Sequence, residues 1–188
     1  MQLTFFGLII GVVVAVFVAL RLLQNIGTTR EMRISQQPCY SDQSVTPFGE
    51  NVLYFDGASI HCLSGTGAIR WSYPVGADAS FTVSDKHLVI WQGTQLYIVD
   101  ENGRPTYNES MSSAIQFARV GKNYVAVIIG GDTEPELLVK DLTGAQVDEE
   151  ADAFSGMMIL DCGFYGDDGQ YLWTLSMDVY GTKANTVM

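Results

Sequence analysis

The sequence predicts an all-β fold of about four four-stranded antiparallel blades of the β-propeller type, preceded by one transmembrane helix. Residues 3–23 are almost entirely apolar, and a pattern of strands and glycine turns recurs after residue 50 at intervals of 36 to 41 residues. No stretch after residue 34 shows the 3.6-residue period of an amphipathic helix. The expected parts are an anchor at 1–23, a polar stalk at 24–43 and a repeat domain at 44–188.

The apolar segment runs from Leu3 to Leu23, with Thr4 and Arg21 as its only polar members. As a helix it spans about 30 Å, the thickness of the hydrocarbon core of a bilayer. A cleaved signal peptide would need a basic start, a shorter apolar run and a small-residue cleavage site, and the sequence lacks all three. We therefore expect an uncleaved anchor, with the lipid bilayer as one partner.

Small residues recur every fourth position of this segment, at Gly7, Gly11, Ala15 and Ala19. They line one helix face and allow a second helix to approach, although such residues are also common in membrane helices without a partner. Three arginines, at positions 21, 30 and 33, follow or end the apolar run, and the positive-inside rule then places the domain in the cytoplasm.

Composition excludes several classes of function. Hydrophobic residues make up 47% of the chain and charged residues 16%, which is unlike a disordered protein. Residues 34–188 contain seven basic and 20 acidic residues, so this part has a net charge of −13 and no partner made of nucleic acid is expected. The three cysteines, Cys39, Cys62 and Cys162, form no metal-binding spacing. Cys62 and Cys162 lie in apolar strand patterns and are predicted to be buried thiols, with one disulfide left open as an alternative.

The repeat is visible when residues 52–71 are placed over the segment 36 residues later. The matching pairs are Gly57 and Gly93, Gly67 and Gly103, Trp71 and Tyr107, Ile60 and Leu96, and Cys62 and Ile98. A third copy follows at an offset of 41, and its five extra residues are expected to lie in the turn at GGDTEP. Glycine supplies the positive φ of tight hairpin turns, and Asp or Asn also fit them.

The repeat resolves into strands in chain order. The first unit is expected at 51–55, 58–63 and 68–72, with an outermost, poorly marked strand near 44–48. The second is expected at 79–84, 87–92, 95–99 and 104–108, and the third at 113–120, 123–129, 136–140 and 145–149. A fourth unit begins at MMILDCGF, turns at YGDDG and continues as QYLWTLSM, but is unfinished.

The turn pattern resembles the quinoprotein-like (PQQ-like) propeller repeat. The residues that carry it are Ser64-Gly65-Thr66-Gly67 with Trp71, Asp100–Gly103 with Tyr107, and Asp141–Gly144. The last unit departs from the pattern, because DDGQYLW is closer to WD40-like or lactonase-like blades. An anchor followed by such blades is similar to uncharacterised bacterial membrane-anchored proteins. This resemblance implies a repeat domain on the outer face of the cell membrane, against the orientation that the arginines predict.

No catalytic, cofactor-binding or metal-binding residue is predicted. Gly65-Thr66-Gly67 lies in a hairpin and is no dinucleotide loop, and His61 and His87 are interpreted as ordinary strand or turn residues. The acidic turns lack the spacing of a calcium loop. Quinone-dependent enzymes of the resembled class use adjacent cysteines, which are absent here, so no cofactor is expected.

The leading hypothesis is a membrane-anchored propeller that acts as a protein-binding or scaffolding module. The alternatives are a metal-dependent enzyme, which needs His and carboxylate side chains to converge, and a ligand sensor that dimerises through its anchor. Closed rings of this blade type usually have about six to eight blades, so we expect that the chain is a fragment, closes as a small ring, or pairs with another chain.

Overall fold

The computed structural model describes residues 14, 16, 34, 36, 38–40, 43–181 and 186–187. The chain divides into two compact units, Met1–Ile34 and Ser35–Met188. The predicted anchor and most of the stalk lie outside the described residues, although Val14 and Val16 are described and are helical. Within the described part of the chain, no helix has the length and apolar character needed to cross a membrane.

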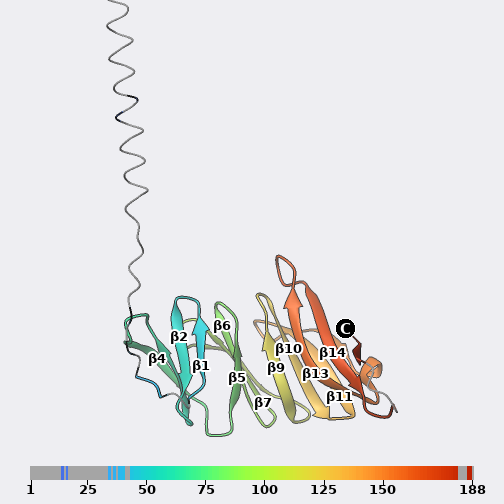
Figure 1. Ribbon diagram of the computed structural model, residues 1–188. Helices are drawn as coiled ribbons and strands as arrows, with labels where there is room; N and C mark the ends of the chain where they lie inside the picture. The colour runs from blue at the N-terminus through green and yellow to red at the C-terminus, as the bar shows by residue number, and fades with distance from the viewer. Residues whose placement is uncertain are drawn as a thin grey trace, which may run out of the picture. The chain divides into compact units, whose positions relative to one another are not determined.

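Residues 45–187 form four antiparallel sheets in chain order (Figure 1). Sheet 1 contains β1 (Val45–Phe48), β2 (Asn51–Phe55), β3 (Ser59–Leu63) and β4 (Ile69–Pro74). Sheet 2 contains β5 (Ser80–Val83), β6 (His87–Gln92), β7 (Gln95–Asp100) and β8 (Pro105–Ser110). Sheet 3 contains β9 (Ile115–Val120), β10 (Tyr124–Gly131), β11 (Glu134–Asp141) and β12 (Gln146–Glu150). Sheet 4 contains β13 (Met157–Tyr165), β14 (Tyr171–Asp178) and β15 (Thr186–Val187).

Each of the first three sheets is a meander of four strands paired in sequence order, which is the architecture of a propeller blade. The predicted strands are confirmed to within a few residues at most ends, and the strand near 44–48 is the edge strand β1. The predicted break at YGDDG is also confirmed, because β13 ends at Tyr165 and β14 begins at Tyr171. A short 3-10 helix, Asp152–Phe154, links sheets 3 and 4 and was not predicted.

The extra residues of the third unit lie largely at GGDTEP, as predicted, but the predicted longer turn was wrong. They do not form a longer turn, because β10 and β11 have eight residues each whereas β6 and β7 have six. Gly130 pairs with Pro135 and Gly131 with Glu134, so the hairpin is extended by further backbone pairing. Added residues gain ladder hydrogen bonds when they extend both strands equally, and a long loop would leave those groups to water.

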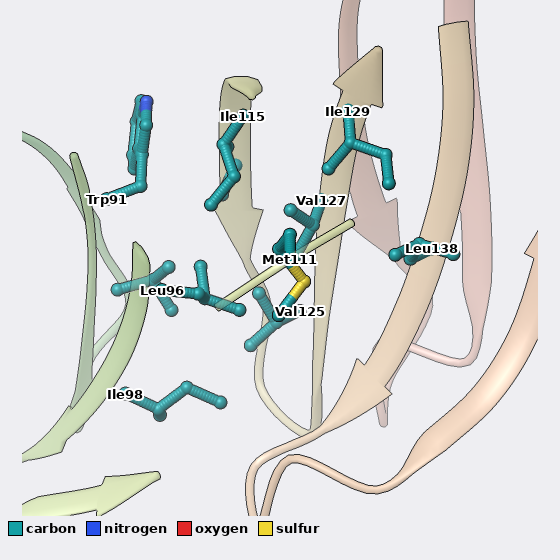
Figure 2. Close-up of a cluster of buried hydrophobic side chains, with 11 residues drawn as sticks. Trp91, Leu96, Ile98, Met111, Ile115, Val125, Val127, Ile129 and Leu138 are labelled. Carbon is teal, nitrogen blue, oxygen red and sulfur yellow. The ribbon is translucent and has the colours of Figure 1, made fainter. Parts of the chain in front are cut away.

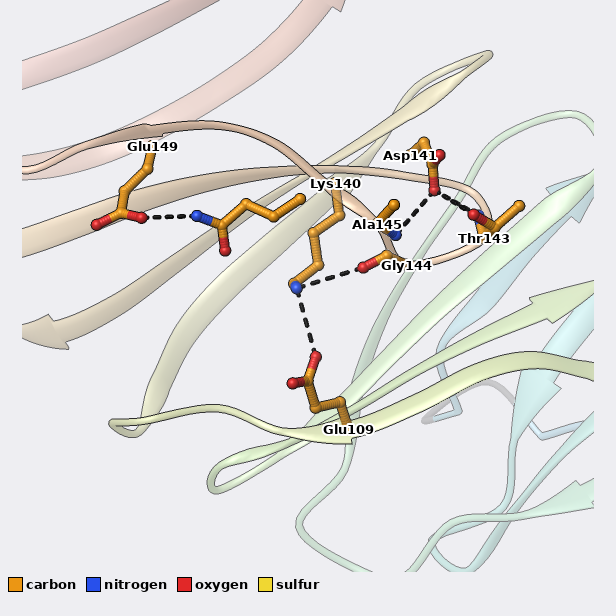
Figure 3. Close-up of polar contacts among 8 residues, drawn as sticks. Glu109, Lys140, Asp141, Thr143, Gly144, Ala145 and Glu149 are labelled. Carbon is orange, nitrogen blue, oxygen red and sulfur yellow. Dashed lines mark hydrogen bonds and ion pairs between the residues drawn. The ribbon is translucent and has the colours of Figure 1, made fainter.

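In each of the repeated Asp-x-x-Gly turns, the aspartate side chain accepts hydrogen bonds from backbone N–H groups of the turn. In sheet 2, Asp100 Oδ1 accepts the backbone N–H groups of Asn102 and Arg104, both at 2.9 Å. In sheet 3, Asp141 Oδ1 accepts those of Thr143 at 2.8 Å and Ala145 at 3.0 Å (Figure 3). The Thr143 hydroxyl also donates to Asp141 Oδ1, at 2.7 Å, and this bond with the backbone donors holds the pKa of Asp141 below its usual value. For Asp100, burial opposes the shift, but the backbone donors still hold the pKa of the carboxyl group below its usual value. The aspartate therefore builds the turn and is not free for other chemistry.

Apolar side chains fill the space between successive sheets. The core between sheets 2 and 3 is shown in Figure 2, where Trp91, Leu96 and Ile98 face Val125 and Val127. Leu53, Ile60 and Cys62 meet Leu88, Ile90 and Val99 between sheets 1 and 2. Ala126, Ile128, Leu137 and Val139 meet Ile159 and Cys162 between sheets 3 and 4. Both faces of β6 and β10 are thus buried, which explains their continuous apolar runs.

An aromatic side chain on the last strand of one sheet packs against a turn glycine of the next. Trp71 lies so close to Gly103 that a Cβ atom added to Gly103 would be 2.7 Å from the indole ring. The Trp71 Nε1–H also donates to the Glu101 carbonyl at 3.0 Å. Tyr107 occupies the same place against Gly144. Trp71 therefore packs between sheets 1 and 2, and the repeated glycines have a second role besides their positive φ.

This contact is absent from the described junction between sheets 3 and 4. In sheet 3, Val139 pairs with Asp148 in the same way as Ile98 pairs with Tyr107 in sheet 2. Asp148 therefore occupies the position that the aromatic Tyr107 has in sheet 2. A cavity of about 240 Å³ opens there, lined by residues that include Val147, Asp148, Phe164 and Leu172. The Arg119 Nε–H donates to Asp161 at 2.8 Å across the same pair of sheets.

The cysteines are thiols among the described residues, and the burial predicted for two of them is confirmed. Cys62 and Cys162 are buried, whereas Cys39 is half-buried. Burial raises the pKa of the Cys162 thiol to about 12 and also raises that of Cys62. Both are therefore protonated, unreactive members of the inter-sheet cores.

Candidate functional site: the turn furrow and a histidine relay

The turns after the first strand of each sheet lie along the upper edge of Figure 1. Two cavities open between these turns. The larger, of about 570 Å³, lies between sheets 2 and 3 and is lined by Ser84, Asp85, Lys86, His87, Gly121, Lys122, Asn123 and Leu142. The second, of about 430 Å³, lies between sheets 1 and 2 and is lined by Phe48, Gly49, Glu50, Asn51, Arg70, Asp85, Lys86 and Glu101. Because the cavities share Asp85 and Lys86, we treat them together as the turn furrow.

Backbone geometry brings the walls of the furrow together. Gly49 has a φ of +57° and lies against the Asp85 carbonyl. A Cβ atom added to Gly49 would be 3.2 Å from that carbonyl oxygen. Lys122 Nζ donates to the Asp167 carbonyl at 2.9 Å and to the Asp168 carboxylate at 3.0 Å. Asn123 adds a bond of 2.8 Å to the Asp168 carbonyl. The furrow therefore continues towards the β13–β14 turn, and the turns hold one another in place.

Cationic side chains are concentrated in the furrow. Residues 43–181 contain six, at Arg70, Lys86, Arg104, Arg119, Lys122 and Lys140. Three of them line the furrow, and Lys86 has no ion pair or hydrogen-bond partner among the described residues. Glu50, Asp85 and Glu101 balance them, so the furrow is close to neutral on a strongly acidic chain. Burial lowers the pKa of His87, which leaves this ring neutral at pH 7.

Two other cations are used inside the fold. Lys140 is only 5% exposed, and its Nζ lies 3.4 Å from both the Glu109 carboxylate and the Gly144 carbonyl (Figure 3). It also lies over the Tyr107 ring, 5.4 Å from the centroid. Arg119 is held by Asp161, as described above. The buried Lys140 is not available to a ligand, and Arg119 joins sheets 3 and 4.

A second polar group lies on sheet 1 and was not predicted. His61 Nε2 lies 2.8 Å from Asp56 Oδ2, and Nδ1 lies 2.7 Å from Ser72 Oγ. A carboxylate only accepts hydrogen bonds, so His61 Nε2–H donates to Asp56. In the tautomer that carries its only proton on Nε2, Nδ1 accepts the Ser72 hydroxyl proton. Tyr54 stacks on the imidazole, with ring centroids 4.8 Å apart. We call these three hydrogen-bonded residues, Asp56, His61 and Ser72, the histidine relay.

Asp56 also organises the β2–β3 turn. Its Oδ1 accepts the backbone N–H groups of Ser59 at 2.7 Å and Ala58 at 2.9 Å. The hydrogen bond from His61, followed by these two, lowers the pKa of Asp56 from 3.8 to about 2. Asp56 is thus a carboxylate at neutral pH and fixes the orientation of the imidazole.

The structure separates the two histidines that the sequence singled out. His61 belongs to the relay on sheet 1, and His87 lines the furrow between sheets 2 and 3. Within the described ranges, no three His, Cys, Asp or Glu residues are placed to hold a metal ion. The relay could have been found from sequence only through pairing, because His61 stands opposite both Tyr54 and Ser72.

No known protein family matches this sequence, and no curated protein sequence matches it. Solved structures with similar sheets include BamB from Moraxella catarrhalis, at 16% identity over 77% of this chain and 48% of that chain, with a TM-score of 0.48. They also include BBS1N in complex with ARL6DN, at 16% identity over 72% and 46%, with a TM-score of 0.48. A third is the Neurospora crassa Pan2 WD40 domain, at 15% identity over 77% and 51%, with a TM-score of 0.43.

This chain spans about half the length of each of those three chains. The blades predicted from the repeat, and with them the resemblance to quinoprotein-like and WD40-like propellers, are confirmed by the four-stranded meanders themselves. The anchor and the bacterial type stay predictions.

Proposed function

We propose that this chain is a single-pass membrane protein whose propeller-type blades bind a protein partner through the turn furrow. The observation that carries the proposal is Lys86, an exposed cation without a described partner in the shared wall of two adjoining cavities. Clefts between turns held on a rigid scaffold are common binding sites. The half-buried side chain of Leu142 lines the same furrow, so it offers both apolar contact and charge.

The partner should place an acidic side chain at Lys86. Elsewhere the chain, with a net charge of −11, repels acidic groups. Glu50, Asp85 and Glu101 further along the furrow favour basic or amide side chains in the same partner. A protein segment can present both kinds of group along one surface, which a small anion cannot do.

A photo-crosslinking amino acid at position 86, in the full chain in its native membrane, tests this proposal. Position 104 is the matched control, because Arg104 is exposed on a neighbouring turn of sheet 2 and does not line either cavity. We expect a protein that crosslinks from position 86 and not from 104. Binding of that purified protein to the full chain in nanodiscs should weaken about tenfold in Lys86→Glu and stay unchanged in Arg104→Glu. Equal effects of both substitutions, or no crosslinked protein, would refute the proposal.

The anchor and the outer-face location belong to the same proposal. Their support is the apolar run from Leu3 to Leu23 and the resemblance to anchored bacterial propellers. A reporter fused after residue 188 that is active only outside the cytoplasm should be active. A reporter that is active only inside would assign the opposite orientation, in agreement with the arginines.

The histidine relay supports a second candidate function, ester hydrolysis. As Ser72 Oγ attacks an ester carbonyl, its proton would pass to His61 Nδ1 and then to the leaving alcohol, and water would release the acyl group from Ser72. A fluorophosphonate probe tests this by phosphonylating an activated serine with loss of fluoride. Labelling of the wild type that disappears in Ser72→Ala and His61→Leu would establish it, and an unlabelled wild type would exclude it.

A further inference from the structure

His87 borders the larger cavity of the turn furrow, on the face of sheet 2 that meets sheet 3. It begins β6, where Val89 and Trp91 belong to the core between these two sheets. Side chains alternate along a strand, so His87 lies on the same face as Val89 and Trp91. The residue is half-buried and lines the cavity of about 570 Å³. The imidazole is therefore placed where a ligand in the cavity can reach it.

The hydrogen bonds that His87 makes within the described part of the chain use its backbone. Its N–H donates to Ser84 Oγ at 3.2 Å, and its carbonyl accepts the Ser84 N–H at 2.8 Å. Among the described residues, neither ring nitrogen has a hydrogen-bond partner. Asp100 stands opposite His87 on β7. Its Oδ1 accepts the N–H groups of Asn102 and Arg104, so this carboxylate serves its own turn. The imidazole thus has unused hydrogen-bonding capacity at the cavity wall.

The charged side chains that line this cavity balance one another while the imidazole is neutral. Lys86 adjoins His87 in the chain, and Lys122 lines the cavity from sheet 3. Asp85 lines the same cavity, and Lys122 is paired with Asp168 at 3.0 Å. The other acids on the adjoining turns are Asp100 and Glu101 at the end of β7, and Asp141 at the end of β11. A proton on His87 would therefore tip the balance of the lining charges to positive.

We propose that this cavity is a pocket for a carboxylate side chain of the protein partner, and that His87 takes up a proton when the carboxylate binds. The proposal rests on the function proposed above, because the carboxylate belongs to the partner of the turn furrow. An ionised carboxylate only accepts hydrogen bonds, and a protonated imidazole donates from both nitrogens. Lys86 supplies a further donor from the same wall. Protonated His87 is thus the form that matches the ligand.

Binding should strengthen as the pH falls from 7.5 to 5.5. Burial has the largest effect on the pKa of His87 and lowers it, Lys86 lowers it further, and Asp100 and Glu101 raise it. A bound carboxylate raises it, so the complex holds the proton more tightly than the free chain, and acid favours the complex. The gain ends once His87 of the free chain is itself protonated. A tenfold gain in affinity corresponds to a pKa about one unit higher in the complex.

The test uses the full chain in nanodiscs of neutral lipid, with hexaglutamate as the probe and hexaglutamine as its uncharged counterpart. Physiological salt screens the repulsion between the probe and the acidic chain. By calorimetry, hexaglutamate should bind about five- to tenfold more tightly at pH 5.5 than at pH 7.5, and hexaglutamine should bind at neither pH. In His87→Gln the two affinities should become equal. Lys86→Gln should weaken binding at both pH values but keep their ratio, because His87 is still present.

A second measurement needs no variant of the pocket. In a chain with isotope-labelled histidine, NMR titration should show a higher pKa for His87 when hexaglutamate is bound. The chain has one other histidine, His61 on sheet 1, and its titration should not change with the probe.

Three results would overturn the proposal. The first is hexaglutamate that binds at neither pH, and the second is binding that is equal at both. The third is a gain on acidification that His87→Gln retains. Each of these leaves a protein that crosslinks from position 86 unaffected. Absence of a crosslinked protein refutes the partner instead and leaves the titration of His87 standing, so the two failures are distinguishable.

Discussion

At the scale of single residues, the main finding is that one aspartate serves both a turn and a histidine. Asp56 accepts two backbone N–H groups with one oxygen and the His61 ring with the other. A hydrogen bond to the ionised form of an acid favours that form, which is why the pKa of Asp56 falls. The interpretation of His61 as an ordinary strand residue was incomplete, because it did not include this contact.

Asp56 should make stability depend on pH in a defined acidic window. The pKa is about 2 when folded against an ordinary value of 3.8, so the folded carboxyl binds its proton less readily. Its contribution to stability is therefore present above about pH 4 and is lost as the pH falls towards 2. In His61→Leu the pKa should move part of the way back towards 3.8, because the backbone donors remain. Carboxyl-carbon NMR titration checks this, and an unchanged pKa in the variant would contradict it.

At the scale of elements, the same glycine positions combine two requirements. Gly144 has a φ of +89°, which other residues adopt only with strain, and it also lies against Tyr107 of the preceding sheet. The recurrence of this glycine thus has a physical origin, because sheets 2 and 3 each present a turn glycine to the aromatic residue of the sheet before it. The turn could be predicted from its Asp and Gly, but the contact with Tyr107 could not, since it joins residues of different sheets.

Gly144→Ala should be more destabilising than Gly57→Ala. Both glycines have similar backbone strain, with φ of +89° and +95°, but a Cβ at position 57 meets nothing within 4 Å. We expect a loss of about 1–2 kcal/mol in the free energy of unfolding at position 57 from the backbone alone. Overpacking against Tyr107 should add about 1–3 kcal/mol at position 144. Chemical denaturation of both variants measures the difference, and equal losses would show that the aromatic contact contributes nothing.

At the scale of the whole molecule, the repeat domain is a series of sheets in which each core is shared by two neighbours. Among the described residues, sheets 2 and 3 share a buried core with a neighbour on each side, whereas sheet 4 shares one with sheet 3, and at that junction Asp148 takes the place of the aromatic residue. Stability in such arrays is approximately a sum over units and the interfaces between them. The last sheet is therefore the least supported.

Sheet 4 should lose protection against hydrogen exchange before sheets 2 and 3. In low denaturant the amides of β13 should exchange through a local opening that leaves β6 and β10 protected. Exchange of all three strands with one common free energy would show instead that the sheets unfold together.

Strand positions, turn types and the blade repeat could be predicted from the sequence, because alternation of apolar residues and the chemistry of Asp and Gly are local properties. The two buried thiols could be predicted from the same alternation. The turn furrow was decided by contacts between sheets, and the histidine relay by pairing between neighbouring strands. The relay depends on pairing across β2, β3 and β4, with a register shift beside Cys62 that alternation alone does not reveal. The furrow exists only because turns 36 residues apart meet when the cores between their sheets are packed.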